Sequence, residues 1–208
     1  MKNVKNITHL FYKCSLIESL PNISGWNTEN VTNISNLFCE CSSLKSLPDI
    51  SLWNIEKIKD ISSLFSGCNS LKKIPDISKW NIQNVNDISY LFNNCSSLEF
   101  LPDISKWNVS NAKKMTSLFN GCSSLIILLD ISNWKINNKD MIDIIFPSEK
   151  ESKISSFKFN YNNSSSVIIS NKDSNDKNDK NIDLKIEYNF PDNDNEEYTD
   201  YYDNFYNK

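Results

Sequence analysis

Apolar and polar positions repeat with a fixed period of 27 residues through most of the chain. Leu-Phe pairs, prolines and Ile-Ser pairs all recur in phase with this period. The tryptophans that follow it are Trp26, Trp53, Trp80, Trp107 and Trp134, and the cysteines are Cys14, Cys41, Cys68, Cys95 and Cys122. A period of this size is typical of proteins built from stacked repeats.

The unit at 84–110, NVNDISYLFNNCSSLEFLPDISKWNVS, predicts what each copy forms. Its first part has apolar residues three or four positions apart, which predicts one face of a helix. These residues are Val85, Ile88, Phe92 and Cys95. The second part contains Pro102, which interrupts a helix and predicts a short extended segment. The pattern therefore predicts an α/β solenoid of five 27-residue coils plus a partial sixth, with a parallel sheet along one side.

The composition changes after Pro147, which predicts a different organisation for the rest of the chain. Alternating apolar and polar residues in ISSFKFNY and DLKIEYNF, with SVIIS between them, predict strands. We therefore expect a solenoid at 1–147 and a small β element or cap at 148–190, with a mobile loop at 171–183. An acidic-aromatic tail at 191–208 is expected to be disordered.

The recurring pattern LFxxCxSLxxLPDISxWNxxNVxxI resembles that of the BspA-like leucine-rich-repeat proteins, whose mycoplasma and protist members have repeats of unknown function. The resemblance extends from about Val4 to Phe146. It implies that the fold is an α/β, right-handed leucine-rich-repeat solenoid. It also implies a role in binding, in bacteria often adhesion at the cell surface, and no catalytic residues.

Charge and hydropathy exclude several classes of protein. The formal net charge is −4, so the strongly basic surface typical of nucleic-acid-binding proteins is not expected. No apolar run approaches the length of a membrane span, and the start MKNVKNITHLFYKC lacks a secretory apolar stretch. These features predict a cytoplasmic protein with no membrane insertion, or a cell-surface protein if the gene model is truncated.

The tryptophan and cysteine series are interpreted as structural core. Cysteines at the end of the apolar stripe are expected to be buried free thiols, the alternatives being a disulfide or metal framework. Cys39 and the single histidine, His9, add too few ligands for a zinc site. Tryptophans in register with buried Ile and Leu are expected to form a ladder, the alternative being a platform that stacks carbohydrates or bases.

A third series is formed by Asp49, Asp76, Asp103 and Asp130, with Asn22 in the first copy. Such residues are expected to accept hydrogen bonds from nearby backbone N–H groups in a turn, and cation binding is the alternative. The sequence has no nucleophile pattern beside His9 and no glycine-rich phosphate loop. It therefore predicts no enzyme activity, no metal and no cofactor.

The residues between the two leucines of each extended segment are expected to face outward, and here the copies differ. The strip is polar and increasingly basic in the first copies and apolar in the last two. The candidate partner-binding residues are Lys45, Lys72, Lys73, Glu99, Phe100, Ile126 and Ile127. Grouped exposed apolar residues mark a contact, either with the C-terminal segment or with another protein. The sequence thus predicts a non-catalytic protein-protein interaction scaffold, with a secreted or cell-surface adhesin as the alternative.

Overall fold

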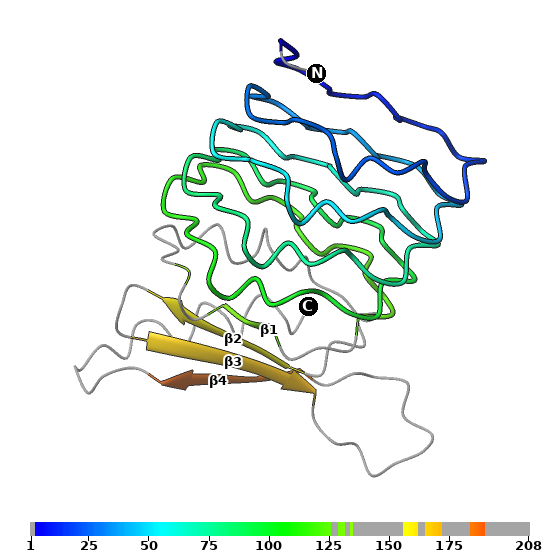
Figure 1. Cartoon of the computed structure of the whole chain (residues 1–208). Coiled ribbons are helices and arrows are strands. Elements are labelled where there is room, and N and C mark those ends of the chain that lie inside the picture. Colours follow the sequence, from blue (N-terminus) through cyan, green and yellow to red (C-terminus); the bar gives the residue numbers. More distant parts are fainter. Residues whose placement is uncertain are drawn as a thin grey trace.

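The computed structural model describes residues 3–125, 129–131, 134, 156–161, 165–171 and 184–189. Within it, successive 27-residue stretches lie one on another as layers (Figure 1). We number the layers from the N-terminus: layer 1 holds residues 4–30, layer 2 residues 31–57, layer 3 residues 58–84, layer 4 residues 85–111, and layer 5 begins at residue 112.

Backbone hydrogen bonds connect each layer to the next between residues 26 to 28 positions apart. The Ile34 N–H donates to the Asp60 carbonyl over 3.2 Å, and the Lys59 N–H donates to the Thr32 carbonyl over 2.9 Å. One series of isolated parallel bridges runs down the layers through Asn6, Asn33, Asp60, Asp87 and Lys114. The layers are therefore held in register by a repeated pattern of contacts between them.

The predicted α/β fold class is wrong. The described residues contain no helix, and the strands among them are limited to β1–β4, with isolated bridges between layers. Where a parallel sheet was expected along the second part of each unit, the described layers have the bridge between Lys73 and Phe100. The molecule is therefore not the predicted α/β, leucine-rich-repeat solenoid.

Two backbone positions in every layer explain why no helix forms. In layer 4 they are Tyr90, with φ 58°, and Asn94, with φ 56°. The corresponding series are His9, Asn36, Ser63, Tyr90 and Ser117, and Lys13, Glu40, Gly67, Asn94 and Gly121. An α-helix needs φ near −60°, so a left-handed residue ends it. Most of these positions carry side chains other than glycine, and the sequence therefore gives little warning of them.

The apolar spacing that suggested a helix comes from a chain of tight turns. The Leu37 N–H closes a turn onto the Ile34 carbonyl (3.2 Å), whereas the Phe38 N–H donates to Leu64 in the next layer (3.1 Å). Leu37 and Phe38 are both fully buried, although they are adjacent in sequence. Turns closed over three residues place apolar side chains inward three or four positions apart, which imitates helical periodicity.

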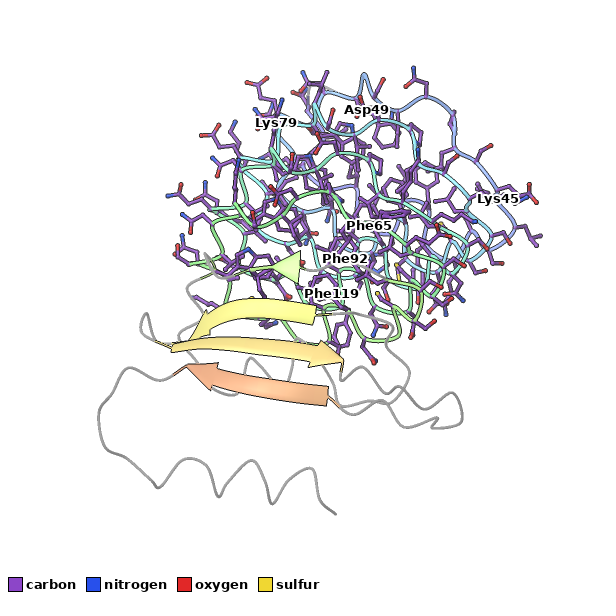
Figure 2. All side chains as sticks on the ribbon, turned by 90° about the horizontal axis from the view of Figure 1, so that it is seen from below. Lys45, Asp49, Phe65, Lys79, Phe92 and Phe119 are labelled. Carbon is purple, nitrogen blue, oxygen red and sulfur yellow. The ribbon has the colours of Figure 1, made fainter. Side chains whose placement is uncertain are left out.

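Aromatic ladders run through the interior of the layers. Phe38, Phe65, Phe92 and Phe119 stack with ring centroids 5.6–6.0 Å apart and nearly parallel planes. Figure 2 shows the labelled phenylalanines following one another inside the molecule, with Lys45 at its periphery. Each side chain in the ladder is buried by the layers on either side of it, so packing depends on contact between layers.

A four-stranded sheet lies at the end of the layers opposite the N-terminus (Figure 1). Its strands, in spatial order, are β1 (Leu129–Asp130), β2 (Ser156–Tyr161), β3 (Ser165–Asn171) and β4 (Leu184–Asn189). β1, which belongs to layer 5, pairs in parallel with β2, whereas β2–β3 and β3–β4 are antiparallel. The division into domains stays a prediction, and the expected mobile loop and tail lie almost entirely outside the described residues.

The part of the chain that the structure describes includes no helix with the length and apolar character needed to span a bilayer.

Candidate functional site

The outer edge of layers 2–4 carries most of the residues predicted to bind a partner. Lys45, Lys72, Lys73 and Phe100 are exposed, and Glu99 is half-buried. Ile126 and Ile127 lie outside the described residues. The structure therefore brings Lys73, Glu99 and Phe100 to neighbouring layers, and it leaves the apolar end of the predicted strip undescribed.

Ion pairs between layers engage three of these residues. Lys45 pairs with Glu18 (2.8 Å) and Lys72 with Glu99 (3.3 Å), and each pair joins residues 27 positions apart. Three of the four side chains are largely exposed and that of Glu99 is half-buried, so each pair stabilises the fold by about 1 kcal/mol or less. Their main effect is to neutralise the cations of Lys45 and Lys72.

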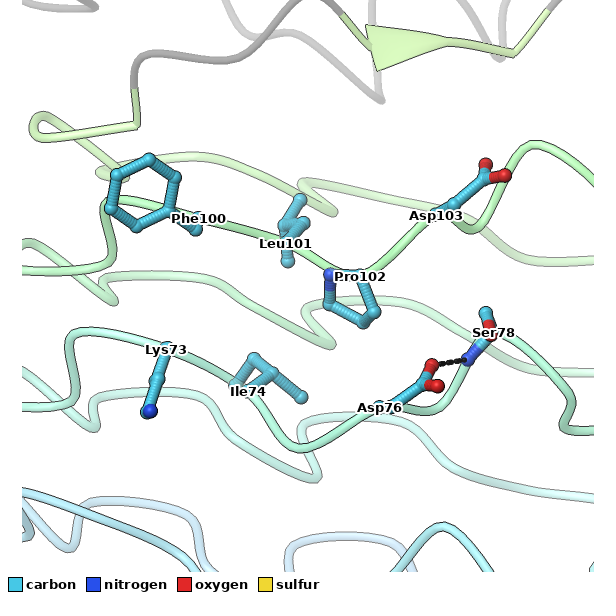
Figure 3. Close-up of a pocket in the computed structure, with 8 residues that line it drawn as sticks. All are labelled: Lys73, Ile74, Asp76, Ser78, Phe100, Leu101, Pro102 and Asp103. Atoms are coloured by element: carbon cyan, nitrogen blue, oxygen red, sulfur yellow. Dashed lines mark hydrogen bonds between the residues drawn. The ribbon is translucent and has the colours of Figure 1, made fainter.

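Lys73 and Phe100 lie at one end of a shallow surface depression between layers 3 and 4 (Figure 3). The parallel bridge between these two residues aligns the extended segments that form the depression. Its volume is about 450 Å³. The lining residues are Lys73, Ile74, Asp76, Ser78, Phe100, Leu101, Pro102 and Asp103. Apolar side chains thus occupy the middle, with a cation at one end and two carboxylates at the other.

The carboxylates at the far end are fixed by local hydrogen bonds. Asp76 accepts a hydrogen bond from the Ser78 N–H over 3.0 Å (Figure 3), and Asp103 accepts one from the Ser105 N–H over 3.0 Å. The hydroxyl and N–H of these serines hold the pKa of each carboxyl below its usual value. Both groups are therefore charged at neutral pH, and this end of the depression attracts cations.

The predicted turn-capping role of the aspartate series is confirmed for Asp49, Asp76 and Asp103. Each accepts a hydrogen bond from the backbone N–H two residues further on, as Asn22 does in layer 1. The side chain of Asp130 is not described. Within the described residues, no group of three or more His, Cys, Asp or Glu side chains is placed to hold a metal ion.

The cysteine series contacts the layer before it. Cys41, Cys68, Cys95 and Cys122 are buried free thiols, whereas Cys14 is half-buried. Each buried thiol of the series donates to the carbonyl of the phenylalanine 30 residues earlier, over 3.0–3.2 Å. Burial raises the pKa of Cys41 to about 11 and that of Cys122 to about 12. These thiols are therefore neutral at physiological pH and poorly nucleophilic.

The tryptophan series makes an equivalent contact. Trp53, Trp80, Trp107 and Trp134 are buried, and each indole N–H donates to the carbonyl of the isoleucine 30 residues earlier, over 3.1–3.2 Å. Trp26, in layer 1, is half-buried. The buried indoles offer no face for a carbohydrate or a base to stack on.

Sequence reasoning missed these hydrogen bonds between layers. The signal was present, because 30 residues separate each phenylalanine from the cysteine of the following copy, and each isoleucine from the tryptophan of the following copy. An indole N–H and a thiol are both donors, and each reaches a carbonyl that already closes a turn within its own layer, because a carbonyl oxygen can accept a second hydrogen bond.

The remaining ionisable candidate, His9, lies at the surface of layer 1. Its ring makes an edge contact with Tyr12, with centroids 5.2 Å apart. No nucleophile is hydrogen-bonded to His9 among the described residues. The prediction that the chain is not an enzyme remains a prediction.

Comparison with known proteins gives a family for this arrangement. A family model described as "Mycoplasma protein of unknown function, DUF285" matches residues 1–97 and again 71–182. The two matches overlap and together span most of the chain, including the described layers and part of the sheet. No curated protein and no solved structure gives a significant match. The chain therefore belongs to the DUF285 family of mycoplasma proteins of unknown function.

Proposed function

We propose that this protein is a non-catalytic scaffold that binds a protein partner along the outer edge of layers 3 and 4. The observation that carries the proposal is Phe100, whose side chain is 57% exposed beside Lys73 in the depression. A single exposed apolar residue is common on protein surfaces. Here it adjoins further apolar lining and a cation without an ion-pair partner among the described residues, which is the composition of a binding site.

The layout of charge suggests the chemistry of the partner. Lys73 and Asp76 lie at opposite ends of an extended segment about 10 Å long. Leu101 and Pro102 lie between these charges on the neighbouring segment. An extended segment of a protein that places a carboxylate near Lys73, an apolar side chain beside Phe100 and a cation near Asp76 complements all three features.

We also propose that the chain is of the BspA-like type. The support for this assignment is the phase in which the Leu-Phe, Cys and Trp-Asn positions recur, together with the family match. Binding, including adhesion, is the role that this type of protein implies, and the proposed site requires no catalytic step.

The experiment changes residues of the site to those that other layers of the same protein carry at the equivalent positions. Layers 1 and 2 carry Ser19 and Ser46 where layers 3 and 4 carry Lys73 and Phe100. The double variant K73S/F100S therefore removes the site while keeping the backbone. Immobilised wild-type and variant chains are incubated with lysate, and the retained proteins are quantified by mass spectrometry.

The matched control is Leu52→Ser, which alters an exposed apolar residue of layer 2 outside the depression. We expect a protein that is retained by the wild type and by L52S, and whose recovery falls at least tenfold with K73S/F100S. Equal recovery by all three chains would contradict the proposal.

A further inference from the structure

One short stretch of the chain carries all three chemical features that complement the depression between layers 3 and 4. The stretch is DNFYNK, with a carboxylate at Asp203, an apolar ring at Phe205 and a cation at Lys208. Residues 190–207 include six carboxylates and no cation, so this order of carboxylate, ring and cation is found there once. The stretch lies outside the described residues, and we call it the 203–208 segment.

The depression presents groups that the described structure leaves available. Lys73 has no ion-pair partner among the described residues, and Phe100 is exposed beside it. Asp76 and Asp103, at the other end, are exposed as well, and neither forms an ion pair among the described residues. A segment that enters the depression therefore need not displace an existing pair.

An extended 203–208 segment fits the depression in spacing as well as in order. Side chains two residues apart point to the same side of an extended chain, so Asp203 and Phe205 face the surface together. With Asp203 placed at Lys73, Phe205 is about 7 Å further along, over the apolar lining in the middle. Lys208 follows three residues later, and its long side chain reaches the end that holds the two carboxylates.

The sheet brings this part of the chain within reach of the depression. β1 belongs to layer 5 and continues the series of extended segments that line the depression, and β2, β3 and β4 follow it in order (Figure 1). Five spacings of about 4.8 Å, or about 24 Å, therefore separate β4 from layer 3. Residues 190–202 connect β4 to the 203–208 segment and span at most about 43 Å. So short a connection gives the segment a local concentration on the order of millimolar at the depression.

We propose that the 203–208 segment occupies the depression of its own chain and competes there with the protein partner. The contact between segment and depression is independent of the proposed function, whereas the competition rests on it. A partner binds only molecules whose depression is open, so occupation by the segment lowers the apparent affinity of the partner. The site is thus regulated by release of the segment.

The test is limited proteolysis of the full 208-residue chain with chymotrypsin, which cleaves after aromatic residues. Cleavage after Phe205 is followed over time by intact-mass spectrometry, and its rate tracks the fraction of molecules in which the segment is released. We expect K73S/F100S to raise this rate at least about fivefold, because the site that holds the segment is lost. Leu52→Ser, outside the depression, should leave the rate unchanged, and circular dichroism should show that both variants stay folded.

A charge exchange tests the expected ion pair between Lys73 and Asp203. Lys73→Glu and Asp203→Lys should each raise the cleavage rate by about threefold, and K73E/D203K should return it close to the wild-type rate. A variant that merely disturbed the packing of layer 3 would not be rescued by a second change 130 positions later in the sequence. Failure of the double variant to restore protection would therefore contradict the pairing.

The two proposals fail in different ways. Equal cleavage rates in all variants would overturn the segment contact and leave the partner site untouched. Protection that increases with protein concentration would also overturn it, because the segment would then come from another copy. If proteolysis follows the expectation while K73S/F100S still retains the same lysate proteins, the contact is supported and the proposed function alone is contradicted. Under competition, D203K should retain more of the partner than the wild type does.

Discussion

Layer 1 and layers 2–4 have the same sequence pattern and differ in what surrounds them. Phe11, Cys14 and Trp26 are half-buried in layer 1, whereas Phe38, Cys41 and Trp53 are buried in layer 2. The difference is not in the residues themselves, since all three positions are chemically identical in the two layers.

The comparison teaches that burial in this protein is created between layers and not within one layer. A layer supplies only part of the environment of its own phenylalanine, cysteine and tryptophan, and the neighbouring layers supply the rest, as when Phe38 stacks on both Phe11 and Phe65. In such an architecture, stability is the sum of contacts between neighbours, and a terminal layer lacks one of them.

The largest expected difference between layer 1 and the inner layers is in the stability lost when a phenylalanine of the ladder is removed. Phe65→Ala leaves a cavity between rings on both sides, 6.0 Å and 5.8 Å away, and should reduce the free energy of unfolding by about 3–5 kcal/mol. Phe11→Ala removes a ring with an exposed side and should cost less than half as much. Urea denaturation followed by tryptophan fluorescence measures both. Equal losses would mean that layer 1 is packed as fully as the interior.

The next largest difference between layer 1 and the inner layers is expected in the reactivity of their thiols. At pH 8, a thiol with a pKa of about 11, as burial gives Cys41, is ionised in about one molecule in a thousand. We expect iodoacetamide to label half-buried Cys14 at least about a hundredfold faster than Cys41 or Cys122. Peptide mapping by mass spectrometry over time gives the individual rates. Denatured protein, in which all six thiols should react alike, is the control.

A smaller contrast is expected from the indole hydrogen bonds. Trp80→Phe removes one of the two donors to the Ile50 carbonyl, which keeps its hydrogen bond from the Trp53 N–H, so the expected cost is about 0.5–1.5 kcal/mol. Trp26→Phe removes an indole N–H that has no hydrogen-bond partner in the described structure, so it should cost less. The comparison uses the midpoints of thermal unfolding. A similar shift for both variants would assign the effect to lost ring volume.

The smallest expected effect is a dependence on pH. The pKa values of Asp49, Asp76 and Asp103 are lowered in the folded state, so their contribution to stability is present above the ordinary carboxyl pKa of 3.8. It is lost as the pH falls through the lowered values. Layer 1 carries Asn22 at this position and lacks the effect. Replacing the three aspartates with asparagine should flatten the decline in thermal midpoint below pH 4, and an unchanged decline would contradict this account.

The sequence predicted which residues repeat and align between layers better than it predicted the conformation of the backbone. Its 27-residue period identified the tryptophans and cysteines that align between layers. It failed on local structure, because turns that bury Ile34, Leu37 and Phe38 have apolar spacings close to those of a helix. The left-handed positions were also hidden, since Tyr90 and Asn94 stand where a glycine would have signalled a turn.

The candidate site was only partly predictable. That Lys73 and Phe100 face outward follows from their place between inward leucines, and both are exposed. Their combination in one depression depends on how layers 3 and 4 align in space, which the repeat pattern does not specify. The pairing of Lys72 with Glu99 also depends on that alignment. Both pairs join residues 27 positions apart in the sequence, but that spacing alone does not show whether two side chains lie close together.

The hydrogen bonds that reach back 30 residues restrict how this chain can change in length. Inserting one residue between Phe65 and Cys95 displaces the thiol from its carbonyl, and an insertion between Ile77 and Trp107 does the same to the indole. Most single-residue insertions in an inner layer break both connections at once. Length is therefore compatible with this packing only in whole multiples of the unit, so that duplication or excision of complete copies is the tolerated route to a longer or shorter array.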